Sequence, residues 1–370
     1  MPHSSTVSTA HRLFYPAAAI HGALAVPLWL AAAGGLLPLG WSPAVHAHEM
    51  VGGYALAVVG GFLMTRLTRA MLAAAFLAWL AGRLVPLAGP PLALALPVAA
   101  AYPLLLFRVA GLPFLRAGRS GHNAVFGPLV GAFTLAEILF RLRLSGILAG
   151  GPAGGALPVE LALVGLLLLA MGGRVIPAAT AGALRSRTLV LEHRVQPRLE
   201  MMSIAGALLY LLSSVCGVLP SLGAAGALFA GAGGLLRLAR WRTLRLWRAP
   251  DILALHLGYL FVGSGWILAG AAELLGLPPA AAPHLLGIGG LGILATAMMV
   301  RTTLQREAEP PWLPAGAVAA VVLLAMAAML RVAAAWWPDW PLLVASGTSW
   351  TVAQLLVAVV LLTRPRRRVR

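Results

Sequence analysis

The 370-residue chain is 60% hydrophobic, has a mean hydropathy of +0.90, and only 10% of its residues are charged. Soluble domains carry about 25% charged residues, so this composition excludes an ordinary soluble globular protein. The formal net charge of +17 is the kind of charge that nucleic-acid-binding proteins carry. However, the low share of charged residues and their distribution along the chain indicate a polytopic membrane protein.

Hydrophobic runs of about 20 residues are long enough to cross a bilayer as helices, and the chain contains about twelve of them. The runs are too apolar for a membrane barrel and lack its alternation, so we predict an all-α polytopic membrane protein. In chain order the runs are centred near Val26, Ala57, Trp79, Ala99, Ala132, Leu168, Leu209, Leu228, Phe261, Gly292, Leu323 and Leu356.

The basic residues set the expected topology. All 27 are arginines, and most of them fall in alternate loops. The positive-inside rule therefore predicts that both termini are cytoplasmic. We expect a cytoplasmic segment at 1–15, a single transmembrane domain at 16–363 and a basic cytoplasmic tail at 364–370. The arginines would face anionic lipid head groups, and no nucleic-acid partner is expected.

The first two spans contain most of the unusual polar residues. The first span carries His21, which the topology places toward the cytoplasmic side. The second span, within Val45–Arg66, begins with His46, His48 and Glu49 at its outer end. Ionisable groups are expensive inside a membrane, so these residues are candidates for a functional site.

The middle of the chain is sparser. The third and fourth spans are predicted to be scaffold, with Arg83 near an end, and the fifth span carries His122 at its start and Glu137 late. The sixth span ends in the text MGGRVIPAAT, which contains Arg174. An arginine there can anchor the helix end by snorkelling, or it can hold a haem propionate through two hydrogen bonds. The single cysteine, Cys216, excludes a disulfide or an iron–sulfur cluster within one chain and is predicted to be a small buried residue.

A repeat links the first two spans with the ninth and tenth. The ninth span carries His256, and the tenth runs from His284 to Arg301. His21 and Arg66 are separated by the same number of residues as His256 and Arg301. The fifth and sixth spans form a looser copy. This match favours four-helix repeats arranged around a central site.

The histidines favour a redox metal. A single histidine in a span is as well explained by a neutral ring bonded to a backbone carbonyl, but six such explanations together are less convincing. Imidazole ligands at the outer ends suit copper, whereas haem iron takes one or two axial histidines. Glu49 has three readings: it fixes a histidine tautomer, carries protons, or lies at a favourable helix N-terminus. The six histidines are His21, His46, His48, His122, His256 and His284.

Four motifs, in this order, resemble the NnrS family: HAHEMVGGYALAVVGGFLMT, GGRVIPAAT, HLGY, and a Gly- and Met-rich helix that begins at a histidine and ends at Arg301. The resemblance covers nearly the whole chain. It implies a twelve-helix protein of the bacterial inner membrane that contains haem and copper and is linked to denitrification and nitric oxide stress. By motif, the cofactor positions would be His46, His48, Glu49, Arg174, His256 and His284.

The expected function is that of a haem–copper protein, with haem of the b type, that binds or reduces nitric oxide. We assign His46, His48, His284 and His256 to metal, and His256, Arg174 and His21 to the haem. A reductase would also take electrons from a quinol or a cytochrome, and protons through Glu49, the candidate catalytic residue, or through Glu137. The alternatives are a transporter or metal-handling permease, and a haem sensor without catalytic activity.

Overall fold

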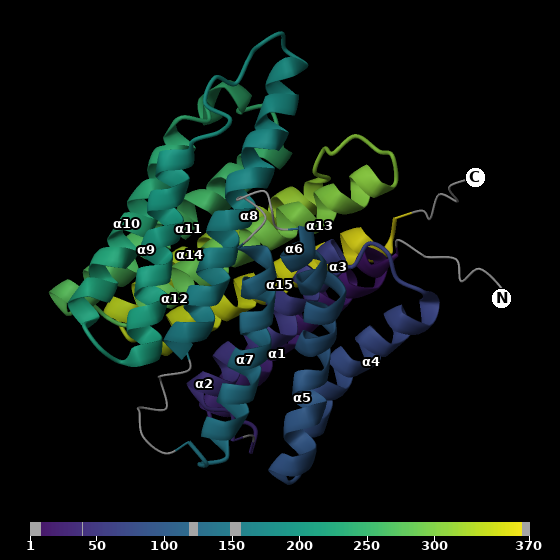
Figure 1. Cartoon of the computed structure of the whole chain (residues 1–370), viewed down its shortest axis with the longest axis vertical. Helices are drawn as coiled ribbons and strands as arrows, with labels where there is room; N and C mark the ends of the chain where they lie inside the picture. Colours follow the sequence, from purple (N-terminus) through teal and green to yellow (C-terminus); the bar gives the residue numbers. More distant parts are fainter. Residues whose placement is uncertain (1–8, 39, 118–124, 149–156, 365–370) are drawn as a thin grey trace. The chain divides into compact units, whose positions relative to one another are not determined.

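The computed structural model describes residues 9–38, 40–117, 125–148 and 157–364. Within these ranges every regular element is a helix, and there is no strand (Figure 1). The all-α prediction is therefore confirmed. His122 lies outside the described residues, so its predicted role at the start of the fifth span is not addressed.

The chain folds as two compact units, Met1–Leu163 and Val164–Arg370. The first unit contains α1 (Ala10–Ala33), α2 (Pro43–His48), the π-helical η1 (Glu49–Ala55), α3 (Leu56–Leu63), α4 (Arg69–Leu84), η2 (Val85–Ala88), α5 (Leu92–Leu106), η3 (Phe107–Gly111), α6 (Leu112–Ala117) and α7 (Phe126–Leu144). The second unit contains α9 (Pro197–Cys216), α10 (Pro220–Ala239), η5 (Thr243–Leu246), α11 (Pro250–Leu275), α12 (Ala281–His284), the π-helical η6 (Leu285–Gly292), α13 (Ile293–Arg306), α14 (Ala315–Trp336) and α15 (Trp340–Leu362). The boundary falls within α8 (Leu157–Arg185).

Ten helical segments in the described part of the chain are long and apolar enough to cross a membrane. Two more helical stretches have similar length, namely α2–η1–α3 and α7, but their histidine, glutamate and arginine residues make them more polar. The described helices therefore agree with about twelve predicted spans. The two polar helices are also the ones that supply most of the buried charge of the first unit.

In the first unit α1 packs against α3 and η1, and α4 packs against α5 (Figure 1). Aromatic rings fill the core between them: Phe14 stacks on Tyr102 with ring centroids 5.5 Å apart. The indole of Trp79 donates to the carbonyl of Gly53 at 2.9 Å, which joins α4 to η1. Buried aromatic side chains with satisfied polar atoms stabilise such helix contacts.

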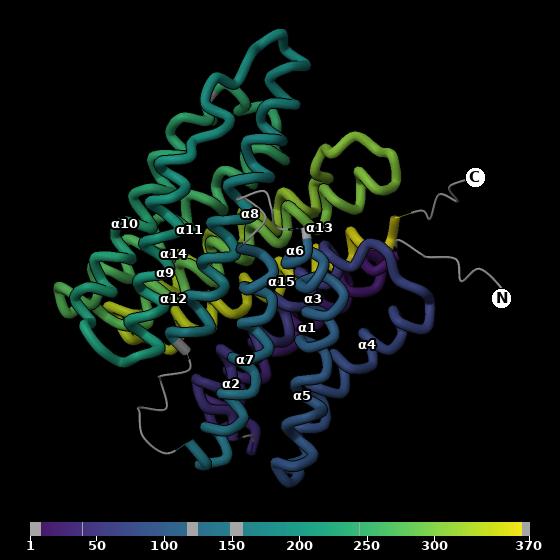
Figure 2. The backbone as a smooth tube through the Cα atoms, viewed as in Figure 1, coloured from purple at the N-terminus to yellow at the C-terminus, as the bar shows by residue number. Residues whose placement is uncertain are grey.

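In the second unit α9, α10 and α11 pack in sequence, and α14 pairs with α15 (Figure 2). The glycines in these helices allow backbones to approach closely, as small residues do in membrane helix pairs. A Cβ atom at Gly206 of α9 would lie 2.5 Å from the carbonyl oxygen of Gly226 of α10. This contact explains why the sequence places glycine at both positions.

The structure supports the repeat between the first and last thirds of the chain. A π-helical segment follows directly after His48 in the first unit, and another follows directly after His284 in the second. Each segment then continues into a regular α-helix, α3 or α13. π-helical segments are uncommon and often mark functional sites, so the matching positions of these two agree with the repeat. A third π-helical segment, η3, follows Leu106 and has no histidine directly before it.

Three predicted details are wrong. The helix α1 extends from Ala10 to Ala33, so His21 lies near its middle rather than toward one end. The positive-inside assignment of the arginines to loops puts Arg141 in an outer loop, but this residue belongs to α7 and is buried. Cys216 is the last residue of α9 and is exposed rather than buried.

Candidate functional site

The first unit contains a network of buried ionisable side chains drawn from five helical elements. Each of its six members is less than 10% exposed, which is unusual because lone buried charges are strongly unfavourable. The elements are α2, η1, α4, α7 and α8. The members are His48, Glu49, Arg83, Glu137, Arg141 and Glu160.

Glu137 on α7 is the centre of this network. Its carboxylate accepts hydrogen bonds from Arg141 Nε at 2.9 Å and from Arg83 Nη2 at 3.5 Å. His48 Nε2 lies 3.0 Å from Glu137 Oε2, although the direction of approach is poor for a hydrogen bond. The other ring nitrogen, Nδ1, lies 2.8 Å from Glu160 Oε1. His48 is therefore enclosed by two carboxylates.

Glu49 connects the network to the first helix. Its Oε1 accepts a hydrogen bond from Arg83 Nη1 at 3.0 Å, and its backbone carbonyl lies 3.1 Å from His21 Nε2. The glycines of the motif make these contacts possible. A Cβ atom at Gly52 would lie 2.9 Å from Arg83 Nη1, and a Cβ atom at Gly53 would overlap the imidazole of His21. The predicted difference in depth between His21 and Glu49 is therefore wrong.

The charges in the network can balance. Glu49 and Glu137 pair with the guanidinium groups of Arg83 and Arg141, and Glu160 pairs with His48. With His48 protonated, three cations face three carboxylates. The ring of His48 stacks on Phe140 with centroids 3.8 Å apart and planes at 4°. Ion pairs and stacking together hold the imidazole in one orientation.

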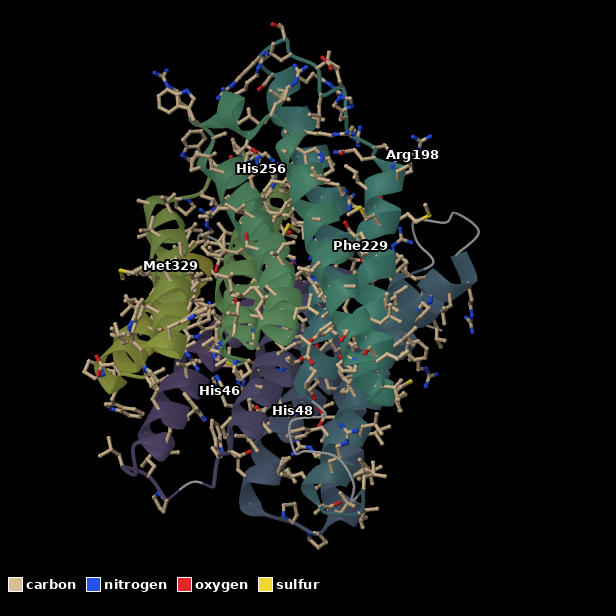
Figure 3. All side chains as sticks on the ribbon, turned by 90° about the vertical axis from the view of Figure 1, so that its left-hand side faces the viewer. His46, His48, Arg198, Phe229, His256 and Met329 are labelled. Carbon is tan, nitrogen blue, oxygen red and sulfur yellow. The ribbon has the colours of Figure 1, made fainter. Side chains whose placement is uncertain are left out.

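The predicted copper ligands do not form a metal site within the described part of either unit. No group of three or more His, Cys, Asp or Glu side chains is arranged there to hold a metal ion. His46, on the same helix as His48 (Figure 3), stacks on Trp29 with centroids 4.6 Å apart. His284 belongs to the second unit, where its Nδ1 donates to the carbonyl of Ala280 at 2.7 Å. The copper site stays a prediction.

The second unit contains an apolar pocket of about 490 Å³ with one imidazole in its wall. His256, labelled on α11 in Figure 3, is 2% exposed. Its Nε2 lies 3.0 Å from the hydroxyl of Thr180, whereas its Nδ1 has no hydrogen-bond partner among the described residues. The lining residues are Leu238, Thr243, Pro250, Leu253, Ala254, His256, Leu257, Leu260, Leu313, Val318, Val321 and Val322.

The GGRVIPAAT motif provides a binding position for an arginine from another helix. Pro177 has no N–H, so the carbonyl of Gly173 loses its helical donor. Arg237 Nη2 of α10 donates to this carbonyl at 3.0 Å. A Cβ atom at Gly173 would overlap the same guanidinium group, so any larger residue there would displace Arg237 from this carbonyl. Arg174 points elsewhere: its side chain is exposed, and its predicted contact with a cofactor stays a prediction.

Arg237 is a functional candidate that the sequence interpretation missed. It is 2% exposed, and it also donates to Glu200 at 3.3 Å and to the hydroxyl of Tyr259 at 3.4 Å. Its guanidinium carbon lies 5.7 Å from the ring centroid of Trp241, which in turn stacks on His256. A glycine four residues before a proline was the available signal, because it marks an open carbonyl in a helix.

A buried ion pair also joins the two helices of the second repeat copy. Arg301 of α13 pairs with Asp251 at the start of α11. Arg301 ends the repeat in the sequence, whereas its carboxylate partner lies 50 residues earlier and is not apparent from the sequence pattern. This pair therefore fixes the end of α13 next to the helix that carries His256.

The family comparison agrees with the motifs. The NnrS family profile, described as "NnrS protein", matches residues 5–366. No curated protein matches the chain with significant similarity. Because the family match extends over nearly the whole sequence, including the motifs around His48, Gly173 and His256, the chain belongs to the NnrS family.

Proposed function

We propose that this membrane protein holds a haem through His256 and uses it to bind or reduce nitric oxide. Its family membership and its apolar helices make it a membrane protein related to nitric oxide stress. One observation above all supports the proposal that His256 binds a haem. A buried imidazole nitrogen without a partner among the described residues belongs to a histidine in the wall of an apolar pocket.

The residues of the pocket fit a haem. Its volume, about 490 Å³, is within the range of cofactor pockets, and nearly all its lining side chains are aliphatic. When bound, haem iron supplies a centre that binds nitric oxide and exchanges electrons. The chain's own contribution would be a ligand nitrogen from His256 and largely aliphatic walls. The ring of Trp241 lies 6.2 Å from that of His256, at an angle of 21° to it.

The buried network of the first unit is the proposed route for protons. Reduction of nitric oxide consumes protons as well as electrons, and a membrane-embedded reaction needs ionisable groups to supply them. Glu49, the proposed catalytic carboxylate, and Glu137 lie in one connected set of ion pairs with Arg83. A quinol or a cytochrome is proposed as the electron donor, and the bacterial inner membrane as the location.

One measurement tests the central proposal. We expect the purified protein to show a Soret band and a reduced-minus-oxidised difference spectrum, with iron and copper in fixed ratio to polypeptide by elemental analysis. Consumption of nitric oxide with an added electron donor would identify an enzyme, and its absence in a haem-loaded protein would identify a sensor. A protein without a Soret band and without stoichiometric copper would contradict the proposal. A transporter or metal-handling permease would then be the remaining alternative.

His256→Ala is expected to remove the haem. Loss of an iron ligand should lower the haem content per polypeptide by more than about tenfold. Mutation of a residue that only hydrogen-bonds to such a ligand already lowers metal affinity by about tenfold or more. Pyridine haemochrome assay of the purified variant measures this content. His193→Ala, in the exposed turn before α9, is the matched control. Equal haem content in the His256 variant and the wild type would contradict the assignment.

His46→Ala and His284→Ala are expected to lower the copper content. The hydrogen bond from His284 Nδ1 to Ala280 places the ring's lone pair on Nε2, the arrangement found in metal-ligating histidines. Mass spectrometry of metals in dialysed protein measures the ratio of copper to polypeptide. Unchanged copper in both variants would eliminate the predicted ligand set.

A further inference from the structure

Thr180 makes two hydrogen bonds that together determine the state of His256. The hydroxyl donates to the carbonyl of Ile176, one turn earlier in α8, at 2.7 Å. The same oxygen lies 3.0 Å from His256 Nε2. Thr180 is completely buried and His256 is 2% exposed, so water does not compete for these contacts.

A threonine hydroxyl has only one hydrogen to donate. Because that hydrogen is used for Ile176, the oxygen can only accept from His256, and Nε2 must carry the proton. In a neutral imidazole the lone pair is then on Nδ1. The opposite tautomer would leave an N–H donor at Nδ1, which is buried without an acceptor among the described residues. Buried N–H groups without acceptors are rarer in proteins than under-used acceptors.

We propose that Thr180 is a positioning residue that holds His256 as the Nε2–H tautomer, so that the lone pair on Nδ1 is the one available to a ligand. The inference that this ligand is haem iron rests on the proposed function, whereas the tautomer does not. The hydrogen bond that Nε2 donates to Thr180 also makes the imidazole a stronger electron donor to iron. Thr180 thus gives the GGRVIPAAT motif a second role beside that of Gly173.

The tautomer can be measured without haem. Solid-state NMR of the ¹⁵N-histidine-labelled full chain in lipid bilayers, prepared under haem limitation, distinguishes protonated from unprotonated ring nitrogens. Subtracting the spectrum of His256→Asn assigns the signals. We expect a protonated Nε2 and an unprotonated Nδ1 in the wild type, and loss of this preference in Thr180→Val. The reverse pattern in the wild type would overturn the proposal.

Haem binding provides the second test. Thr180→Val should weaken haem affinity by about 10–100-fold and raise the reduction potential, because the imidazole becomes a weaker donor. Thr180→Ser keeps the hydroxyl and should restore both. Thr303→Val is the matched control, since Thr303 is buried in the same unit and donates to the carbonyl of Met299 one turn earlier.

The outcomes separate the two proposals. A haem-loaded Thr180→Val protein with wild-type affinity and potential would overturn the positioning role while leaving haem at His256. A wild type that binds no haem would overturn the proposed function, and the NMR measurement would still decide the tautomer.

Discussion

Glu137→Gln is expected to lower the free energy of unfolding by about 3–5 kcal/mol, the usual result of removing one partner from a buried ion pair. Glutamine preserves the shape of the side chain but removes the negative charge that faces Arg83, Arg141 and His48. These cations would then share the carboxylates of Glu49 and Glu160. Unfolding in mixed micelles, followed by tryptophan fluorescence, measures the change.

The exposed Glu273 at the end of α11 provides a control for this experiment. Glu273→Gln should change the unfolding free energy by less than about 0.5 kcal/mol, as expected for a surface substitution. Equal free energies of unfolding for the two variants would contradict this prediction. They would show that the ion pairs of Glu137 do not stabilise the folded protein.

Arg237→Met is expected to have the second large effect. Methionine fills similar space but leaves the carbonyl of Gly173 buried without a donor, which costs about 1–3 kcal/mol of stability. The substitution also removes the cation that pairs with Glu200. It also removes the guanidinium from the face of Trp241, the ring that stacks on His256. Stability and haem content should therefore fall together, and thermal unfolding and pyridine haemochrome assay measure both.

Arg240→Met, at the exposed end of the same helix, separates the effect of position from the effect of charge. This control should retain both the stability and the haem content of the wild type. A loss of stability in Arg237→Met with unchanged haem content would show that Arg237 supports the helices without acting on the pocket.

The helices themselves could be predicted because length and hydrophobicity alone decide which segments cross a bilayer. The partners of the polar residues could not. Arg83 was assigned to the end of a scaffold helix, but its guanidinium contacts Glu49 and Glu137, which lie far from it in the sequence. Glu160 received no role, because nothing near it in the sequence indicates that it would face His48.

The glycine-rich motifs were recognised, but their purpose was only partly predicted. The arginine within the GGRVIPAAT motif, Arg174, was assigned to a cofactor. The structure instead places Arg237 against Gly173. The prediction for His256 was based on an ionisable group in an apolar span. The structure places this residue among those that line an apolar pocket, and its role as a cofactor ligand stays a prediction. For both residues the neighbours depended on tertiary packing, which the sequence pattern does not reveal.

The gap in the hydrogen bonding of α8 also bears on how the protein is made. When α8 leaves the ribosome, Pro177 cannot supply a donor to the carbonyl of Gly173, and the residue that does so, Arg237, is 64 residues further along the chain. A helix with an exposed carbonyl is poorly suited to lipid. The backbone of α8 therefore obtains this hydrogen bond only after α10 has been synthesised and has packed against it.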